Sequence, residues 1–177
     1  MSREPFTKRL ADWVAAARAN ALFRLGVGGA AFVALADQAS KYWILEIVRL
    51  PAKFRIELTP VFDLTFVKNY GASFGLLAGG MLSRVILSVV AIAISAGLII
   101  WLARIERRIL AAAVAFIVGG ALGNLIDRLR FGYVVDFLDF SGLYFPWVFN
   151  LADASINVGV ALILLDAWLR RKRVPNP

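Results

Sequence analysis

The run ILAAAVAFIVGGALGNLIDRL, residues 109–129, is apolar along most of its length and turns polar only near its end, at Asn124, Asp127 and Arg128. A helix needs about 20 apolar residues to cross the hydrocarbon core of a bilayer. A G-x-x-x-G spacing that begins at Gly119 lets two helices approach closely in lipid. The sequence therefore predicts a membrane span with a polar cluster at one end.

Three further runs have the same character, and the composition of the whole chain agrees with them. The 177 residues are 60% hydrophobic and 18% charged, with a mean hydropathy of +0.74, which is the balance of a membrane protein. A net charge of +8 could indicate a nucleic-acid partner, but the basic residues lie beside the apolar runs, so none is predicted. The four predicted spans are residues 22–43, 82–102, 109–129 and 153–169.

The positions of the basic residues predict the orientation of the spans. By the positive-inside rule, both termini and the short turn between the second and third spans are cytoplasmic. The longer connections, residues 44–81 and 130–149, then face outward. The basic residues concerned are Arg3, Lys8, Arg9, Arg18 and Arg24; Arg104, Arg107 and Arg108; and Arg170, Arg171, Lys172 and Arg173. We divide the chain into a basic interfacial segment (1–21), one four-helix membrane domain (22–169) and a basic cytoplasmic tail (170–177).

The segment before the first span has a helical apolar stripe with basic residues among its polar positions, which favours a helix lying on the anionic inner leaflet. The stripe consists of Phe6, Leu10, Trp13, Val14 and Ala17. An alternative is a secretory signal with Ala34-Leu35-Ala36 as its cleavage site. That signal would have an unusually long basic region, and cleavage would discard Asp37 and Lys41.

The first outward connection has the pattern of a small sheet. Apolar and polar residues alternate over residues 54–58 and again over 62–66, with Pro60 between the two runs. This alternation predicts two antiparallel strands with one apolar face, resting on the membrane or cupping an apolar substrate. The expected fold is an all-α membrane protein: four transmembrane helices with a small extracytoplasmic β-sheet between spans one and two.

Two aspartates, Asp136 and Asp153, end short apolar runs in a chain that has no histidine and no cysteine. The absence of these two residue types excludes a Ser-His-Asp triad, a cysteine nucleophile and a zinc site built on His or Cys. Carboxylates so close to sequence that is apolar enough to lie in a membrane are energetically costly, and they are therefore functional candidates. Asp153 has a structural alternative as the capping-box partner of Asn150. Asp136 has none, and Asp139 is expected to be a solvated or loop-stabilising charge.

Five blocks resemble, in order and spacing, the bacterial lipoprotein signal peptidases, the signal peptidase II family. The resemblance covers about residues 23–169. The blocks are DQASK (37–41), NYGASFG (69–75), GGALGNLIDR (119–128), VVDF (134–137) and FNLAD (149–153).

This resemblance implies a four-span inner-membrane aspartic protease that removes the signal peptide from diacylglyceryl-modified prolipoproteins, just before the lipid-modified cysteine. It implies Asp136 and Asp153 as the catalytic dyad and an active site toward the periplasm. The sheet-like connection would form a cradle over the substrate. We expect no cofactor or metal, contact with membrane lipid, and a monomer. The supporting residues it implies are Asp37, Lys41, Asn69, Gly71, Asn124, Asp127, Arg128, Asn150 and Ala152.

The chemistry of two carboxylates fits peptide hydrolysis, which needs one ionised group and one protonated group. Asp153 is the expected ionised partner because a helix N-terminus favours a carboxylate. We expect Asp127 and Arg128 to be mainly structural, at a helix end. Two other classes of function stay open at this point: a proton-coupled transporter with intramembrane carboxylates, and a non-catalytic scaffold for lipoprotein precursors.

Overall fold

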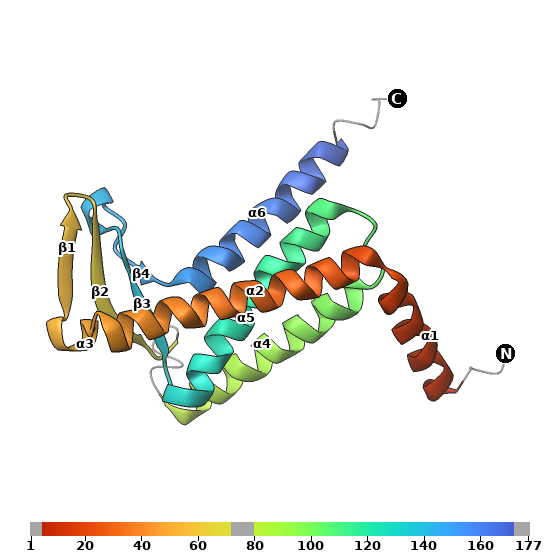
Figure 1. Cartoon of the computed structure of the whole chain (residues 1–177), viewed down its shortest axis with the longest axis horizontal. Helices are drawn as coiled ribbons and strands as arrows, with labels where there is room; N and C mark the ends of the chain where they lie inside the picture. Colours follow the sequence, from red (N-terminus) through yellow and green to blue (C-terminus); the bar gives the residue numbers. More distant parts are fainter. Residues whose placement is uncertain (1–4, 72–79, 172–177) are drawn as a thin grey trace.

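Four long helices run alongside one another, with a small sheet at one end of the bundle (Figure 1). The computed structural model describes residues 5–71 and 80–171. All four helices are long and apolar enough to cross a membrane, and they agree with the predicted spans to within a residue or two. They are α2 (Ala21–Tyr42), α4 (Met81–Leu102), α5 (Arg108–Phe131) and α6 (Leu151–Arg171).

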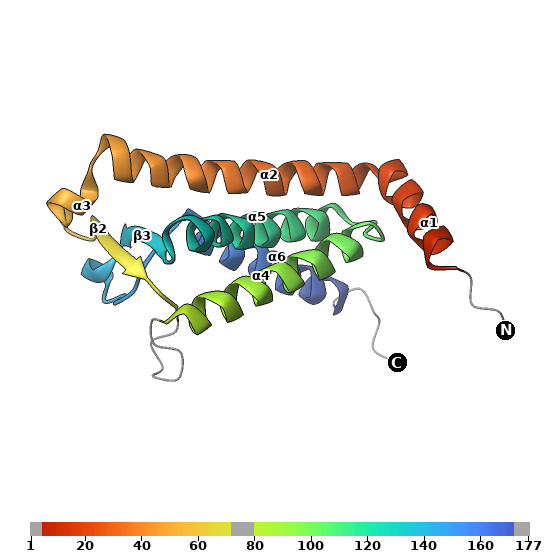
Figure 2. The same ribbon diagram turned by 90° about the horizontal axis from the view of Figure 1, so that it is seen from below.

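Shorter helices extend the bundle at both ends. At the sheet end, α2 continues into the π-helical turn η1 (Trp43–Ile47) and the short helix α3 (Leu50–Lys53). At the opposite end, α1 (Phe6–Ala19) turns away from α2 (Figure 2). The helix predicted for the N-terminal segment is therefore confirmed. Its contact with lipid stays a prediction.

Asn20 fixes the corner between α1 and α2. Its side-chain oxygen caps α2 by accepting a hydrogen bond from the Leu22 N–H at 2.8 Å. Its amide donates to the carbonyl oxygens of Ala103 and Ile105, at 3.2 and 3.1 Å. One side chain thus joins the start of α2 to the turn between α4 and α5.

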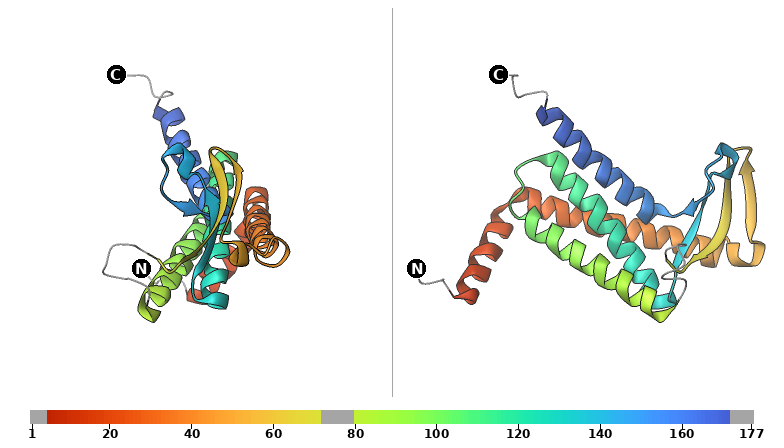
Figure 3. Two further views of the ribbon diagram at one scale, coloured as in Figure 1. Left: turned by 90° about the vertical axis from the view of Figure 1, so that its left-hand side faces the viewer. Right: turned by 180° about the vertical axis from the view of Figure 1, so that it is seen from behind.

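Helix α5 is the central span, packed against the other three (Figure 3). Within its apolar window 61% of the residues are buried, against 17–22% in the other spans. Glycines allow this close packing: Gly119 lies against α2 and Gly120 against α6. The packing role predicted for the G-x-x-x-G spacing is confirmed.

Replacing Gly119 with alanine is expected to destabilise the bundle. An added Cβ would lie 2.6 Å from the Val33 Cβ and 2.7 Å from the Ala30 carbonyl oxygen. Overpacking of this kind costs about 1–3 kcal/mol, which thermal unfolding in detergent would detect. Gly28→Ala is the matched control, because a Cβ there meets nothing within 4 Å. Equal shifts for the two variants would contradict the packing assigned to Gly119.

The sheet has four antiparallel strands in the order β1-β2-β3-β4. The hairpin predicted between spans one and two is present as β1 (Arg55–Thr59) and β2 (Phe62–Asn69). The other two strands, β3 (Val134–Asp139) and β4 (Val148–Phe149), come from the second connection. These two strands were not predicted, so the prediction of a sheet formed by the first connection alone was incomplete. The register places Asp136 of β3 opposite Val67 of β2.

The apolar residues predicted to share one face of the hairpin differ in burial. Leu64 packs with Val135 and Phe137 in a core that also includes Ile44 and Leu50. On the edge strand, Leu58 is exposed, and Phe54 lies outside the strand and is 72% exposed. Asp63 is buried on β2 because its carboxylate pairs with Arg55 of β1, at 2.5 Å. This ion pair raises the pKa of Arg55 through the hydrogen bond and charge of Asp63.

Candidate active site

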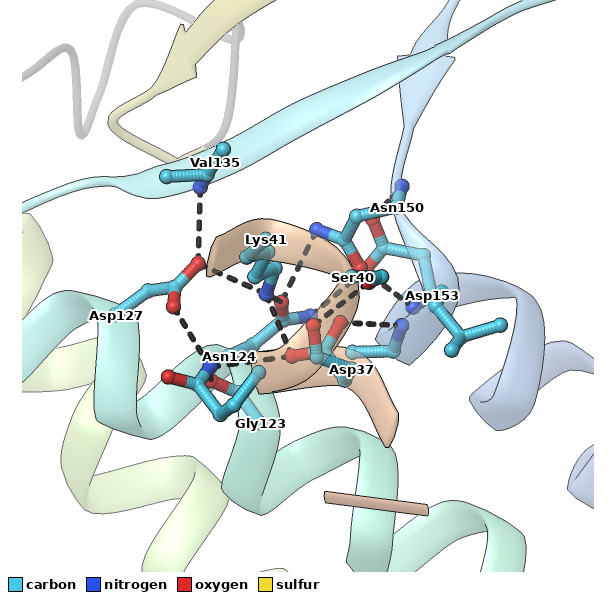
Figure 4. Close-up of polar contacts among 12 residues, drawn as sticks. Asp37, Ser40, Lys41, Gly123, Asn124, Asp127, Val135, Asn150 and Asp153 are labelled. Atoms are coloured by element: carbon cyan, nitrogen blue, oxygen red, sulfur yellow. Dashed lines mark hydrogen bonds and ion pairs between the residues drawn. The ribbon is translucent and has the colours of Figure 1, made fainter. Parts of the chain in front are cut away.

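Polar side chains from three helices and two strands meet where the sheet joins the bundle. Figure 4 shows the part of this cluster around Lys41 and Asn124. Helix α2 supplies Asp37 and Lys41, α5 supplies Asn124 and Asp127, and the start of α6 supplies Ala152 and Asp153, with Asn150 just before it. Strand β2 ends at Asn69, and Asp136 is on β3. Nine of the predicted site residues are therefore brought together by the contacts that follow, and Gly71 and Arg128 border them.

Asp136 is held by two amides. Its side chain is 2% exposed. Oδ1 accepts from Asn150 Nδ2 at 2.6 Å, and Oδ2 accepts from Asn69 Nδ2 at 2.9 Å. Burial raises the pKa of Asp136 to about 7, and the negative charge of Asp153 adds to the rise. The two amide donors act in the opposite direction because they stabilise the ionised form.

Asp153 caps its own helix and also faces the cluster. Asn150 Oδ1 accepts from the Asp153 N–H at 3.0 Å, and Asp153 Oδ2 accepts from the Asn150 N–H at 3.4 Å. This is the capping box predicted as the structural alternative. The other carboxylate oxygen accepts from Asn124 Nδ2 at 2.8 Å. Asn150 therefore contacts both aspartates and links them.

A buried ion-pair triad lies beside the two aspartates. Lys41 Nζ is 2.8 Å from Asp37 Oδ2 and 2.8 Å from Asp127 Oδ2. All three side chains are at most 2% exposed. Lys41 also donates to Asn124 Oδ1 at 3.2 Å, which turns the amide group of Asn124 toward Asp153. The cation thus sets the orientation of a side chain that contacts a candidate catalytic residue.

The two carboxylates of this triad also hold the backbone next to each aspartate. Asp127 Oδ2 accepts from the Val135 N–H at 3.0 Å, directly before Asp136. Asp37 Oδ1 accepts from the Ala152 N–H at 2.9 Å, directly before Asp153. The triad therefore fixes the positions of two chain segments far apart in sequence.

Asp127 and Arg128, both expected to be structural, make different contacts in the structure. Asp127 pairs with Lys41, because its side chain turns into the bundle. Arg128 is only partly buried, and its Nη1 makes a long contact of 3.5 Å with the Asn124 carbonyl oxygen. The structural role predicted for Asp127 at the helix ends does agree with these contacts.

Gln38 was not among the predicted site residues. Its Nε2 donates to Asp127 Oδ1 at 2.9 Å and to the Gly123 carbonyl oxygen at 3.1 Å, with a longer contact to Asp37 Oδ2 at 3.3 Å. Its position, one helical turn before Lys41 in a polar block, was a signal that could have identified it.

Gly71 orients Asn69. Its backbone has φ of +93°, in the left-handed region that favours glycine. Its N–H donates to Asn69 Oδ1 at 2.9 Å, so the Asn69 amide group is free to turn toward Asp136. The rest of the NYGASFG block, residues 72–75, lies outside the described residues, as do Arg3, Lys172 and Arg173.

Asp139 stabilises a loop, which was one of the two alternatives predicted for it. It accepts from Thr65 Oγ1 at 2.6 Å and from the Ser141 N–H at 2.9 Å. Although burial opposes its ionisation, these hydrogen bonds hold the pKa of Asp139 below its usual value. The side chain is 6% exposed, so the solvated alternative was wrong.

Comparison with known proteins shows the family to which the chain belongs. The model of the signal peptidase (SPase) II family matches residues 29–169. The chain belongs to the signal peptidase II family. The resemblance expected from the five sequence blocks is confirmed, and the alternatives of a transporter and a scaffold are set aside.

Relatives in the signal peptidase II family match most of the chain. A lipoprotein signal peptidase from Caulobacter vibrioides is 48% identical, over 79% of this chain and 84% of that protein. One from Rhizorhabdus wittichii is 44% identical, over 90% of this chain and 95% of that protein. A bacterial membrane enzyme solved at 2.3 Å resolution by the in meso method superposes with a TM-score of 0.73 and 28% identity, over 86% of this chain and 93% of that chain.

The family match contains all eleven predicted site residues and leaves α1 outside it. This signal peptidase II is a membrane-embedded protease, and the matched region contains the sheet, the polar cluster and most of the four spans. In the described residues, no group of three or more His, Cys, Asp or Glu side chains could hold a metal ion.

Proposed function

We propose that Asp136 and Asp153 are the catalytic pair with which this signal peptidase II removes the signal peptide from diacylglyceryl-modified prolipoproteins. One observation carries the assignment. Two carboxylates on separate elements share Asn150 as a hydrogen-bond donor, and burial together with the charge of Asp153 raises the pKa of Asp136 to about 7. Such a pair holds one proton near neutral pH.

The reaction then needs only these two groups and a water molecule. Ionised Asp153 takes a proton from water while the water oxygen bonds to the scissile carbonyl carbon. Protonated Asp136 gives its proton to the carbonyl oxygen. When the tetrahedral intermediate collapses, the C–N bond breaks and the proton taken up by Asp153 passes to the leaving amine. Asp136 takes back a proton from a hydroxyl of the intermediate as the new carboxyl group forms. The pair returns to its starting state with one proton.

The neighbouring residues act as positioning residues. Asn124 and the helix N-terminus stabilise the negative charge of Asp153. Asn69 and Asn150 fix the carboxyl plane of Asp136. Lys41, Asp37 and Asp127 hold the two chain segments that carry the dyad. Fixed geometry of this kind favours catalysis because little reorganisation is needed as charge develops.

The proposed enzyme lies in the bacterial inner membrane with its sheet end toward the periplasm. The basic residues support this orientation. Arg104 and Arg107 follow α4, and Arg170 is in the last turn of α6. These parts of the chain lie at the end of the bundle opposite the sheet, on the same side as α1 (Figure 1), and basic residues favour the cytoplasmic side. We further propose that α1 lies on the inner leaflet, that residues 22–169 form one peptidase domain, and that the protein acts as a monomer without a cofactor.

The proposed substrate position follows from this orientation. The catalytic pair would sit near the outer boundary of the membrane, where a lipid-modified cysteine just after a signal peptide would lie. The acyl chains would stay in the bilayer while the peptide passes under the sheet, which acts as a cradle. Cleavage would fall directly before the modified cysteine.

The purified protein in detergent should shorten a diacylglyceryl prolipoprotein, as seen by gel mobility, and leave the same precursor without lipid uncut. Mass spectrometry of the product should place the cut directly before the modified cysteine. Equal cleavage of the two precursors would contradict the lipid requirement. No cleavage of the lipidated precursor would contradict the proposed function.

A further inference from the structure

A cavity of about 450 Å³ opens at the end of the bundle away from the sheet, between the α4–α5 turn and the last turns of α6. Its volume lies within the roughly 300–1,000 Å³ typical of small-molecule sites. Arginines from both segments line it: Arg104, Arg107 and Arg170. The catalytic cluster is at the other end of the bundle, so this cavity plays no part in the proposed hydrolysis.

Asp166 organises the cavity. Its side chain is 5% exposed, and Oδ2 lies 2.6 Å from Arg107 Nη1 and 3.3 Å from Arg170 Nε. A carboxylate in the last turns of a helix is disfavoured by the helix dipole, and the two arginines offset this unfavourable interaction. Its other oxygen, Oδ1, is buried without a hydrogen-bond partner in the part of the chain that the structure describes. A residue that lines the cavity therefore carries a buried acceptor without a donor among the described residues.

The cavity has a net positive charge and a graded polarity. Its three arginines outnumber its two carboxylates, Asp166 and Glu106, and Arg104 is exposed. Leu110 and Ile163 line it about one turn further into the bundle than Arg107 and Asp166. The arginines thus line the part of the cavity at the end of the bundle, and the apolar side chains line the part toward the membrane interior.

We propose that this cavity binds the headgroup of an anionic glycerophospholipid that carries a hydroxyl, such as phosphatidylglycerol. The phosphate lies between Arg104 and Arg170, whose guanidinium groups suit bidentate binding of phosphate oxygens. The glycerol backbone rests on Leu110 and Ile163. A headgroup hydroxyl donates to Asp166 Oδ1 after a small rotation of that carboxylate.

Native mass spectrometry of the full chain in detergent tests this proposal, with added phosphatidylglycerol or phosphatidylcholine. We expect one saturable phosphatidylglycerol adduct, and weaker binding of phosphatidylcholine that does not reach saturation. The double variant Arg104→Gln/Arg170→Gln should weaken phosphatidylglycerol binding about tenfold or more, since each basic residue near a membrane surface contributes measurably to anionic-lipid affinity. Thermal unfolding would verify that the variant is folded.

The matched control is Arg49→Gln/Lys53→Gln, which removes the same charge from two exposed residues at the sheet end of the bundle, outside the cavity. We expect the control to keep the saturable adduct. Equal weakening by both pairs would show general charge attraction and overturn the site. Soluble glycerol phosphate that displaces the lipid at equal concentration would show an ion site without lipid recognition, and would also overturn it.

Discussion

Replacing Asp136 with asparagine is expected to abolish cleavage of the lipidated precursor while the protein stays folded in detergent. Asparagine keeps the size of the side chain, and its oxygen can still accept a hydrogen bond from Asn69 or from Asn150, but it cannot transfer the proton. Loss of a general acid or base costs about 10²–10⁴-fold in rate. Single-turnover cleavage with purified enzyme in excess would measure the loss directly.

Asp153→Asn should cause a loss of similar size, because it removes the proposed base. Asp139→Asn is the matched control, since Asp139 is on the same strand as Asp136 but hydrogen-bonds only Thr65 and Ser141 among the contacts described above. The control should keep most of its activity. Full turnover by either dyad variant, or an equal loss in the control, would refute the assignment.

Replacing Lys41 with methionine should have the largest effect on stability. The change leaves the carboxylates of Asp37 and Asp127 buried near each other without their shared cation. Removing one partner of a buried ion pair typically costs about 3–5 kcal/mol. Thermal unfolding in detergent would show the decrease, and cleavage should fall as well because the backbone next to each aspartate loses its anchor.

A second substitution checks the cause of this loss. Asp127→Asn in the Lys41→Met background leaves one buried carboxylate in place of two, so part of the stability should return. If Lys41→Met unfolds at the same temperature as the unchanged protein, the triad does not hold the site together. If the double variant is less stable than Lys41→Met alone, charge repulsion is not the cause.

Sequence alone located the four spans because length and hydropathy are local properties. The hairpin β1–β2 was also visible, through its period-two alternation. Strand β3 was not, because Val134-Val135-Asp136-Phe137 is nearly uniformly apolar, and its residues are buried on both faces. Strand β4 has only two residues, too few for any pattern to appear.

The site was predictable residue by residue but not as a network. The blocks predicted the candidate dyad and its neighbours, whereas the partners of Asp127 are set by packing between helices that are distant in sequence. The same limit applied to Asp153, for which capping and catalysis were alternatives. Its N–H and one oxygen form the capping box with Asn150, and its other oxygen contacts Asn124, so both roles are compatible.

The shared proton is the central claim, and infrared difference spectroscopy of the carboxyl band tests it most directly. Because the pKa of Asp136 is raised to about 7, its protonated band should persist below that pH and vanish as the pH rises through it. Cleavage should fall over the same range as the pair loses its proton. The band should be absent from Asp136→Asn and shift to lower pH in Asp153→Asn, where the like charge is removed. An Asp136 that is already ionised at about pH 5, or that titrates identically in Asp153→Asn, would contradict the account.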